Sequence, residues 1–322
     1  MALTKVHTLV EENSVVQPEE WPCSAVVVNF RRYDLLSTCI AALNASSIPP
    51  DEVIVVDNES EAAKLTEFAA RYPSVEVIAN ETNAGFATAC NQGWRASSRP
   101  FVLFVNPDVT VERECLRECL AAISEARDIG VVTCRLVLPD GRLDHACHRG
   151  IPTPLASLAY MLRLHKVFPH SRRLGRYTMS WLDPLSVHDV EACSGAFMLV
   201  RREVLAEAGG WDEGYWFYAE DLDLCLRIGR LGKRVRYLGT TTAIHLKGAS
   251  SHLRERTREL SPGERITKRK VQAAIIDSHR RFFRQHFEKS TPWPVRTMIR
   301  AVFATQRIRL SLATRLDGIR GA

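Results

Sequence analysis

The 322-residue sequence lacks several features that would place it in a common protein class. It has no run of 18 or more apolar residues, so we expect no transmembrane helix. Residues 1–21 lack the apolar core of a secretory signal and are interpreted as a polar lead-in. The glycine fingerprints of dinucleotide-binding folds and of P-loop NTPases are also missing, which argues against a dehydrogenase or a P-loop enzyme.

Paired cysteine motifs are absent as well. The nine cysteines form an odd set without a CxxC pair, so no spacing supports a zinc site. Most of them lie in apolar patterns, as Cys39 and Cys225 do. This pattern predicts buried, reduced thiols in a cytosolic protein.

The first half of the chain alternates short apolar strands with helical patterns. Candidate strands lie at residues 25–29, 52–57, 75–79 and 101–105. Such alternation predicts an α/β fold with a mostly parallel sheet covered on both faces. Ligands of these sheets bind beyond the carboxyl ends of the strands. The polar residues at these ends, which predict a nucleotide cleft, include Asn29, Arg31, Asp57, Asn58, Asn83 and Asn106.

The chain divides into an α/β domain over residues 22–250 and a tail over residues 251–322. Residues 139–188 interrupt the domain with prolines and a basic, aromatic stretch, and we interpret them as an irregular insertion. Later strands are predicted at residues 190–201, 234–238 and 241–245.

The tail is the basic part of the protein. From Arg254 onward it has 17 Lys and Arg against 6 Asp and Glu, in two amphipathic helical patterns. Basic amphipathic helices with aromatic residues bind anionic membranes, so we expect peripheral contact with the inner face of the plasma membrane. The alternative is packing on the body or on a second subunit, as in a homodimer. No nucleic-acid recognition motif accompanies the basic residues, so we expect no nucleic-acid partner.

Three features carry candidate chemistry. Asp108 follows an apolar strand in the sequence Asn-Pro-Asp, where a carboxylate can hold Mg²⁺ or Mn²⁺ or simply close a turn. Glu220 and Asp221 begin a helix after an aromatic run, where a carboxylate can act as general base or merely cap the helix. His245 ends a strand and becomes a credible metal ligand only together with Asp108 and Asp221.

Six sequence blocks occur in a fixed order: VVVNF (26–30), VIVVDNES (53–60), NETNAGFATACNQG (80–93), FVLFVNPDV (101–109), the long block from Ser194 to Arg227, and AIHLKGAS (243–250). In this order they resemble the GT-A-fold glycosyltransferases of family 2, within them the bacterial rhamnosyltransferase-like group. The resemblance implies a Rossmann-like, mostly parallel sheet flanked by helices, with the tail as a C-terminal helical appendage to a GT-A catalytic domain.

The resemblance also implies residue roles. Asp221 matches the catalytic base, and Asp108 and His245 match the metal site. Family members often have a second carboxylate where this chain has Asn106, and asparagine where it has Arg31. The residues that the resemblance assigns to the donor nucleotide are Asn29, Arg31, Asp57, Asn58, Asn83, Gly85, Phe86 and Asn106. Those assigned to the sugar and acceptor are Gly195, Trp216 and Glu220.

The implied activity is a metal-dependent, inverting transfer from a nucleotide-diphosphate sugar to a hydroxyl group. dTDP-L-rhamnose is the preferred donor, and a glycan or polyprenyl-linked glycolipid of the bacterial cell envelope is the expected acceptor. A UDP-hexose or UDP-galactofuranose donor remains an alternative within this class. A non-catalytic, membrane-associated scaffold that retains the fold is the alternative from another class.

Overall fold

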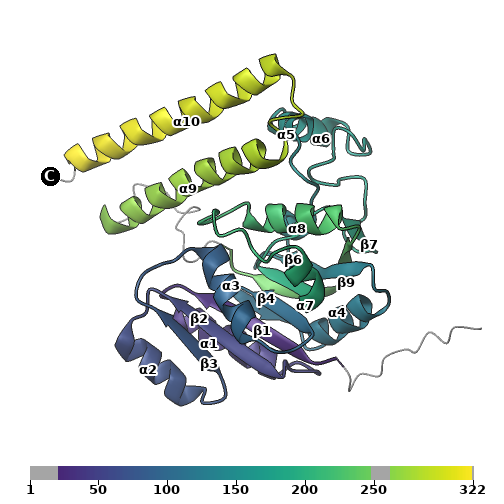
Figure 1. The fold of residues 1–322 in the computed structure, drawn as a ribbon, viewed down its shortest axis with the longest axis vertical. Helices are drawn as coiled ribbons and strands as arrows, with labels where there is room; N and C mark the ends of the chain where they lie inside the picture. Colours follow the sequence, from purple (N-terminus) through teal and green to yellow (C-terminus); the bar gives the residue numbers. More distant parts are fainter. Residues whose placement is uncertain (1–20, 248–261, 321–322) are drawn as a thin grey trace, which may run out of the picture.

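A computed structural model describes residues 21–247 and 262–320 (Figure 1). Residues 1–20 of the predicted lead-in and residues 251–261 of the predicted tail lie outside the described part.

One mixed sheet organises the described residues. Its order is β3-β2-β1-β4-β8-β6-β9-β5, and β7 pairs with β9. The first four strands in this order run parallel, whereas β8 is antiparallel to both of its neighbours. The mostly parallel α/β sheet predicted from the sequence is therefore confirmed. The strands are β1 (Cys23–Asn29), β2 (Glu52–Asn58), β3 (Glu76–Asn80), β4 (Phe101–Val105), β5 (Val109–Val111), β6 (Ile129–Val137), β7 (Val187–Val190), β8 (Phe197–Arg201) and β9 (Arg234–His245).

Helices pack against the sheet, with α3 on β1 and β2 and α4 on β6 and β9. Close packing at α3 depends on Gly93, because a Cβ there would lie 2.3 Å from Cγ1 of Val26. The helices of the body are α1 (Tyr33–Asn44), α2 (Ala62–Arg71), α3 (Phe86–Ala96), α4 (Cys115–Ser124), α5 (Pro154–Met161), α6 (Leu164–Val167), α7 (Arg202–Glu207) and α8 (Glu220–Arg230).

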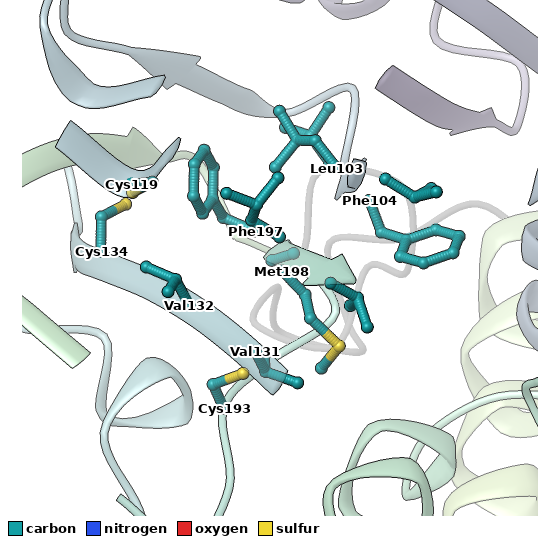
Figure 2. Close-up of a cluster of buried hydrophobic side chains, with 14 of the residues drawn as sticks. Leu103, Phe104, Cys119, Val131, Val132, Cys134, Cys193, Phe197 and Met198 are labelled. Atoms are coloured by element: carbon teal, nitrogen blue, oxygen red, sulfur yellow. The ribbon is translucent and has the colours of Figure 1, made fainter. Parts of the chain in front are cut away.

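The hydrophobic core lies on the central strands. Figure 2 shows side chains of β4, β6 and β8 packed together, with Cys119 and Cys134 among them. All nine cysteines are buried and free, as the apolar sequence pattern predicted. Burial of these apolar side chains stabilises the sheet, and the ends of its strands carry the candidate site.

The predicted strand over residues 190–201 is wrong, because the chain forms β7 and β8 with a loop between them. Gly195 in this loop approaches two aromatic rings, and a Cβ on it would lie 3.1 Å from Phe86 and from Trp211. The two strands predicted over residues 234–238 and 241–245 are one strand, β9, whose register with β6 shifts between Ile129 and Val131 and again between Cys134 and Arg135.

The insertion over residues 139–188 holds a 3₁₀ turn (His145–Cys147), α5 and α6, and it leads into β7. Helix α5 begins as its sequence dictates. The Thr153 side chain accepts a hydrogen bond from the Ala156 amide, and Pro154 occupies the first turn, where a missing N–H has no cost.

Two long helices end the described chain, α9 (Pro262–His286) and α10 (Trp293–Arg320). Figure 1 shows α9 running along the body beside α8, with α10 folded back along α9. Phe282 and Phe283 of α9 are buried, whereas Trp293 and Ile308 of α10 are largely exposed. Among the residues described, no helix is long and apolar enough to span a membrane.

Candidate active site

A cavity of about 1370 Å³ opens at the carboxyl ends of the parallel strands. Its walls come from the strand ends, the insertion, the start of α8 and, through Lys270 and Val271, from α9. Asn29, Asp57 and Gly85 are not among the lining residues. The predicted site residues that line the cavity are Arg31, Asn58, Asn83, Phe86, Asn106, Asp108, Gly195, Trp216, Glu220, Asp221 and His245.

Asp57, which the resemblance assigns to the donor nucleotide and specifically to its base, is fully buried. Its two carboxylate oxygens accept hydrogen bonds from Nδ2 of Asn29 at 2.7 Å and from the Tyr33 hydroxyl at 2.5 Å. Burial, followed by the hydrogen bond to Asp57, raises the pKa of Tyr33 to about 12. Recognition of a base by Asp57 would therefore require Tyr33 to share or release this carboxylate.

The loop over residues 83–86 is fastened at both ends. The Asn58 side chain donates to Oδ1 of Asn83 and accepts from the Ala84 amide, each at 2.9 Å. Gly85 has a φ of +90°, and a Cβ on it would lie 2.8 Å from Cδ1 of Trp216. The next amide, of Phe86, donates to the Trp216 carbonyl at 2.9 Å. The loop that carries the predicted donor residues Asn83, Gly85 and Phe86 thus contacts the aromatic segment before α8.

Asp108 and His245 meet because β5 and β9 are antiparallel neighbours, with Val109 opposite His245. Oδ1 of Asp108 lies 3.4 Å from Nε2 of His245. The other ring nitrogen, Nδ1, donates to Oδ2 of Asp144 at 2.8 Å, and Lys247 pairs with the second oxygen of Asp144. Burial opposes a charge on this imidazole, but the two carboxylates outweigh burial and raise the pKa of His245 to about 9.

Asp144 lies in the insertion and was not predicted from the sequence. No spacing motif marks it, because it reaches His245 across 101 residues of chain. A carboxylate that holds the second nitrogen of a histidine is the usual support of a metal-binding imidazole, since it fixes the ring orientation.

The Asp108–His245 pair is suited to a divalent cation bound jointly with a diphosphate. Within the described part of the chain, no group of three or more His, Cys, Asp or Glu side chains is placed to hold a metal ion. Mg²⁺ commonly takes only one or two protein ligands and completes its coordination with phosphate oxygens and water. The two side chains with Asp144 behind them satisfy that requirement, although a metal would have to displace the proton that His245 carries.

Asp221 lies at the start of α8 and faces the same cavity. The two residues before the helix, Tyr218 and Ala219, have φ values of 69° and 66°, a conformation unfavourable for side chains other than glycine. This strained turn directs the first residues of α8 toward the insertion. There, Oδ2 of Asp221 accepts a hydrogen bond from Nη2 of Arg149 at 2.7 Å and a longer one, at 3.4 Å, from the Gly195 amide.

Arg149 is a second residue that the sequence did not reveal. Its side chain is 13% exposed and that of Asp221 is 12% exposed, so the pair is largely shielded from water. Burial disfavours the guanidinium charge, yet the charge of Asp221 outweighs burial and keeps the pKa of Arg149 above its ordinary value. The ion pair holds the Asp221 carboxylate in one orientation.

Glu220 has a different environment from its neighbour. Its Oε2 is buried and has no hydrogen-bond partner. Burial, followed by the negative charge of Asp221, raises the pKa of Glu220 to about 8. A carboxyl group with a pKa this far above its ordinary value can stay protonated at neutral pH, and such groups are frequent in functional sites.

Helix α9 fixes α8 in place. Nε2 of His286 lies 2.6 Å from Oδ1 of the fully buried Asp223, whose other oxygen pairs with Arg227 at 2.7 Å. Ser278 of α9 donates to the carbonyl of Phe217 at 2.9 Å, just before the strained turn. The first tail helix is therefore part of the structure that positions Asp221.

The sequence of this chain matches a known protein family and several curated relatives. The sequence pattern of the family described as Glycosyl transferase family 2 matches residues 24–209. An N-acetylglucosaminyl-diphospho-decaprenol L-rhamnosyltransferase from Mycobacterium tuberculosis is 27% identical over 237 residues, covering 70% of this chain and 76% of the relative. Rhamnosyltransferase WbbL from Escherichia coli is 25% identical over 228 residues, covering 68% of this chain and 81% of the relative.

Two solved structures share the fold at low sequence identity. The mannosyltransferase PcManGT from Pyrobaculum calidifontis, solved with GDP-Man and Mn²⁺, has a TM-score of 0.50 at 14% identity and covers 90% of this chain and 86% of that one. GalNAc-T7, solved with UDP, GalNAc and Mn²⁺, has a TM-score of 0.53 at 16% identity and covers 88% of this chain. The match spans 54% of the GalNAc-T7 chain. The family match shows that this chain belongs to glycosyltransferase family 2, and the solved structures share its GT-A fold.

Proposed function

We propose that this protein is an inverting glycosyltransferase that transfers L-rhamnose from dTDP-L-rhamnose to a hydroxyl of a lipid-linked glycan in bacterial cell-envelope synthesis. One observation carries the proposal. The Asp221 carboxylate and the Asp108–His245 pair line the same cavity as Asn83 and Phe86, which supports a general base and a diphosphate site within one cavity.

In the proposed reaction, Asp221 takes the proton of the acceptor hydroxyl while that oxygen attacks the anomeric carbon. A new carbon–oxygen bond forms as the bond from the anomeric carbon to the diphosphate breaks, and the diphosphate leaves with the bonding electrons. Attack opposite the leaving group inverts the anomeric centre. Arg149 and the Gly195 amide hold the carboxylate in place for this transfer.

Mg²⁺ or Mn²⁺ would be held by Asp108 and His245, with Asp144 fixing the imidazole. When bound, such a cation offsets the negative charge that grows on a departing diphosphate. Both solved structures with the related fold contain Mn²⁺, which supports a divalent cation here.

The choice of sugar and acceptor follows the relatives. Two are named as rhamnosyltransferases, and one of these names includes a decaprenol-linked diphosphate acceptor. A polyprenyl-linked acceptor would place the enzyme in the cytoplasm, at the inner face of the plasma membrane. A UDP-hexose or UDP-galactofuranose donor is the alternative that a direct donor screen decides.

The test is a screen of nucleotide sugars for a rise in melting temperature, with and without Mn²⁺. A ligand that binds only the folded state at about 100 times its Kd stabilises by about 2.7 kcal/mol, which raises the melting temperature by several degrees. We expect dTDP-L-rhamnose with Mn²⁺ to give the largest rise, and Asp108→Asn to lose the Mn²⁺-dependent part. A larger rise with a UDP-sugar would refute the rhamnose assignment. Binding without any transfer or hydrolysis would favour the non-catalytic scaffold.

A further inference from the structure

Helix α5 presents its large apolar side chains to solvent and its small ones to the protein. Leu155, Leu158 and Met161 are 58%, 44% and 68% exposed, whereas Ala156 and Ala159 are each 1% exposed. The spacing of three residues places the exposed side chains on one helical face. A helix of a water-soluble surface normally has the opposite arrangement, so this face is suited to an apolar environment outside the protein.

The exposed apolar residues continue beyond α5. Leu162, Val167 and Phe168 are 60%, 66% and 51% exposed, and Figure 1 shows α5 and α6 projecting beyond the central sheet. Soluble proteins expose single apolar side chains often but contiguous groups rarely, and such groups mark interaction sites. We name these six residues the α5–α6 surface: Leu155, Leu158, Met161, Leu162, Val167 and Phe168.

The charge around this surface has one sign. Residues 145–182 contain six Lys or Arg and no Asp or Glu. Arg163, Lys166, Arg172 and Arg173 are exposed beside the apolar side chains. An apolar face surrounded by cations is complementary to an anionic lipid bilayer, which offers acyl chains and negative headgroups together. A purely apolar protein partner would leave these cations without counterions.

The same two helices border the candidate active site. Tyr160, His165 and Lys166 line the cavity from α5 and α6, although the neighbouring residues face solvent. We propose that the α5–α6 surface docks on an anionic membrane and thereby places the cavity mouth at the lipid surface. The second part rests on the proposed function, because only a lipid-linked acceptor benefits from this placement. Docking itself requires neither donor nor catalysis.

Helix α10 is the competing surface. It also exposes apolar residues, among them Met298, Val302 and Ile308, and it belongs to the basic tail from which membrane contact was predicted. None of the cavity-lining residues comes from α10. Docking through α10 alone would therefore attach the protein to a membrane without bringing the active site to it.

The test is vesicle flotation with the full-length protein, using vesicles of phosphatidylcholine alone or mixed equally with phosphatidylglycerol. We expect binding only to the mixed vesicles. The variant Leu158→Ser/Met161→Ser/Phe168→Ser should reduce it at least about tenfold, because insertion depends on buried apolar area. The matched control on α10, Met298→Ser/Val302→Ser/Ile308→Ser, should retain most of it.

A charge variant gives a second measurement. Arg163→Gln/Arg172→Gln/Arg173→Gln should also weaken binding to anionic vesicles and remove much of its salt dependence. All three variants change exposed residues, so unchanged melting temperatures and unchanged donor-induced stabilisation would show that folding and donor binding are intact. Wild-type binding by the α5–α6 variant, loss of binding only in the α10 variant, or no binding by the wild type would each overturn the proposal.

Discussion

Replacing Asp221 by Asn separates the proposed role of this side chain as general base from its observed ion pair with Arg149. The amide has nearly the same shape and can still accept a hydrogen bond from Arg149, which now lies 2.7 Å from the carboxylate. It cannot take a proton from an acceptor hydroxyl. We expect turnover to fall by at least about 100-fold, the usual contribution of a general base, whereas donor affinity stays unchanged.

The same substitution has a cost in stability that can be worked from the ion pair. Asp221 and Arg149 are 12% and 13% exposed, so water screens their interaction only weakly. Removing one partner of a buried pair costs about 3–5 kcal/mol, because the other charge stays buried without compensation. Arg149 cannot avoid this cost by losing its proton, since a guanidinium stays charged at any physiological pH. Asp221→Asn should therefore also lower the free energy of unfolding by an amount near the lower end of this range.

A double variant distinguishes catalysis from stability. Adding Arg149→Met to Asp221→Asn removes the uncompensated cation, so we expect urea denaturation to show recovery of much of the lost stability. Product formation at saturating donor, measured at a temperature where each variant is folded, should stay at least about 100-fold below wild type. If activity returned together with stability, Asp221 would be a structural residue. Near-wild-type turnover in the single variant would equally refute its role as base.

Two further predictions concern the same cavity. Gly85→Ala should cost about 1–3 kcal/mol of stability and weaken donor binding, because φ at Gly85 is +90° and the added Cβ would lie 2.8 Å from Trp216. Urea denaturation measures the loss of stability, and donor titration measures the loss of affinity. Full donor affinity in this variant would show that the loop is not part of the donor site. Glu220→Gln should flatten the pH dependence of stability. The folded-state pKa of about 8 exceeds the ordinary value of 4.5, so the stability that the protonated carboxyl contributes is complete below pH 4.5 and is lost as the pH rises to 8. Equal slopes of unfolding free energy against pH for both proteins across that window would contradict the assignment.

The parallel half of the sheet could be predicted from the sequence because its strands are continuous apolar runs. Predicted strands over residues 25–29, 52–57 and 101–105 correspond to β1, β2 and β4 within two residues at every end. Strands that are buried on both faces are apolar at nearly every position, so they can be recognised as continuous apolar runs in the sequence. The polar residues after them meet at one edge because all parallel strands end on the same side of the sheet, so Asn58, Asn106 and Asp108 could be placed near the cavity without coordinates.

The partners of the two key side chains could not be predicted in this way. Arg149 reaches Asp221 across 72 residues, and Asp144 reaches His245 across 101. Both partners come from the insertion, whose short helices and turns have no long apolar period. A single charged residue in such a segment carries no local sign of its partner, because the contact depends on how the whole insertion folds over the cavity.

The tail shows how composition alone can group two elements that differ physically. Its basic residues suggested one membrane-facing appendage. In the structure, however, α9 buries Phe282 and Phe283, whereas α10 leaves Trp293 and Ile308 largely exposed to solvent. Nε2 of His286 in α9 lies 2.6 Å from the fully buried Asp223 of α8. Removing α9 would uncover the apolar surface on which Phe282 packs and leave a buried carboxylate oxygen of Asp223 without its hydrogen-bond partner, which would destabilise the helix that carries Asp221. A truncation intended to test membrane binding by the tail must therefore begin after α9, at residue 292, because an earlier end point would change the active site itself.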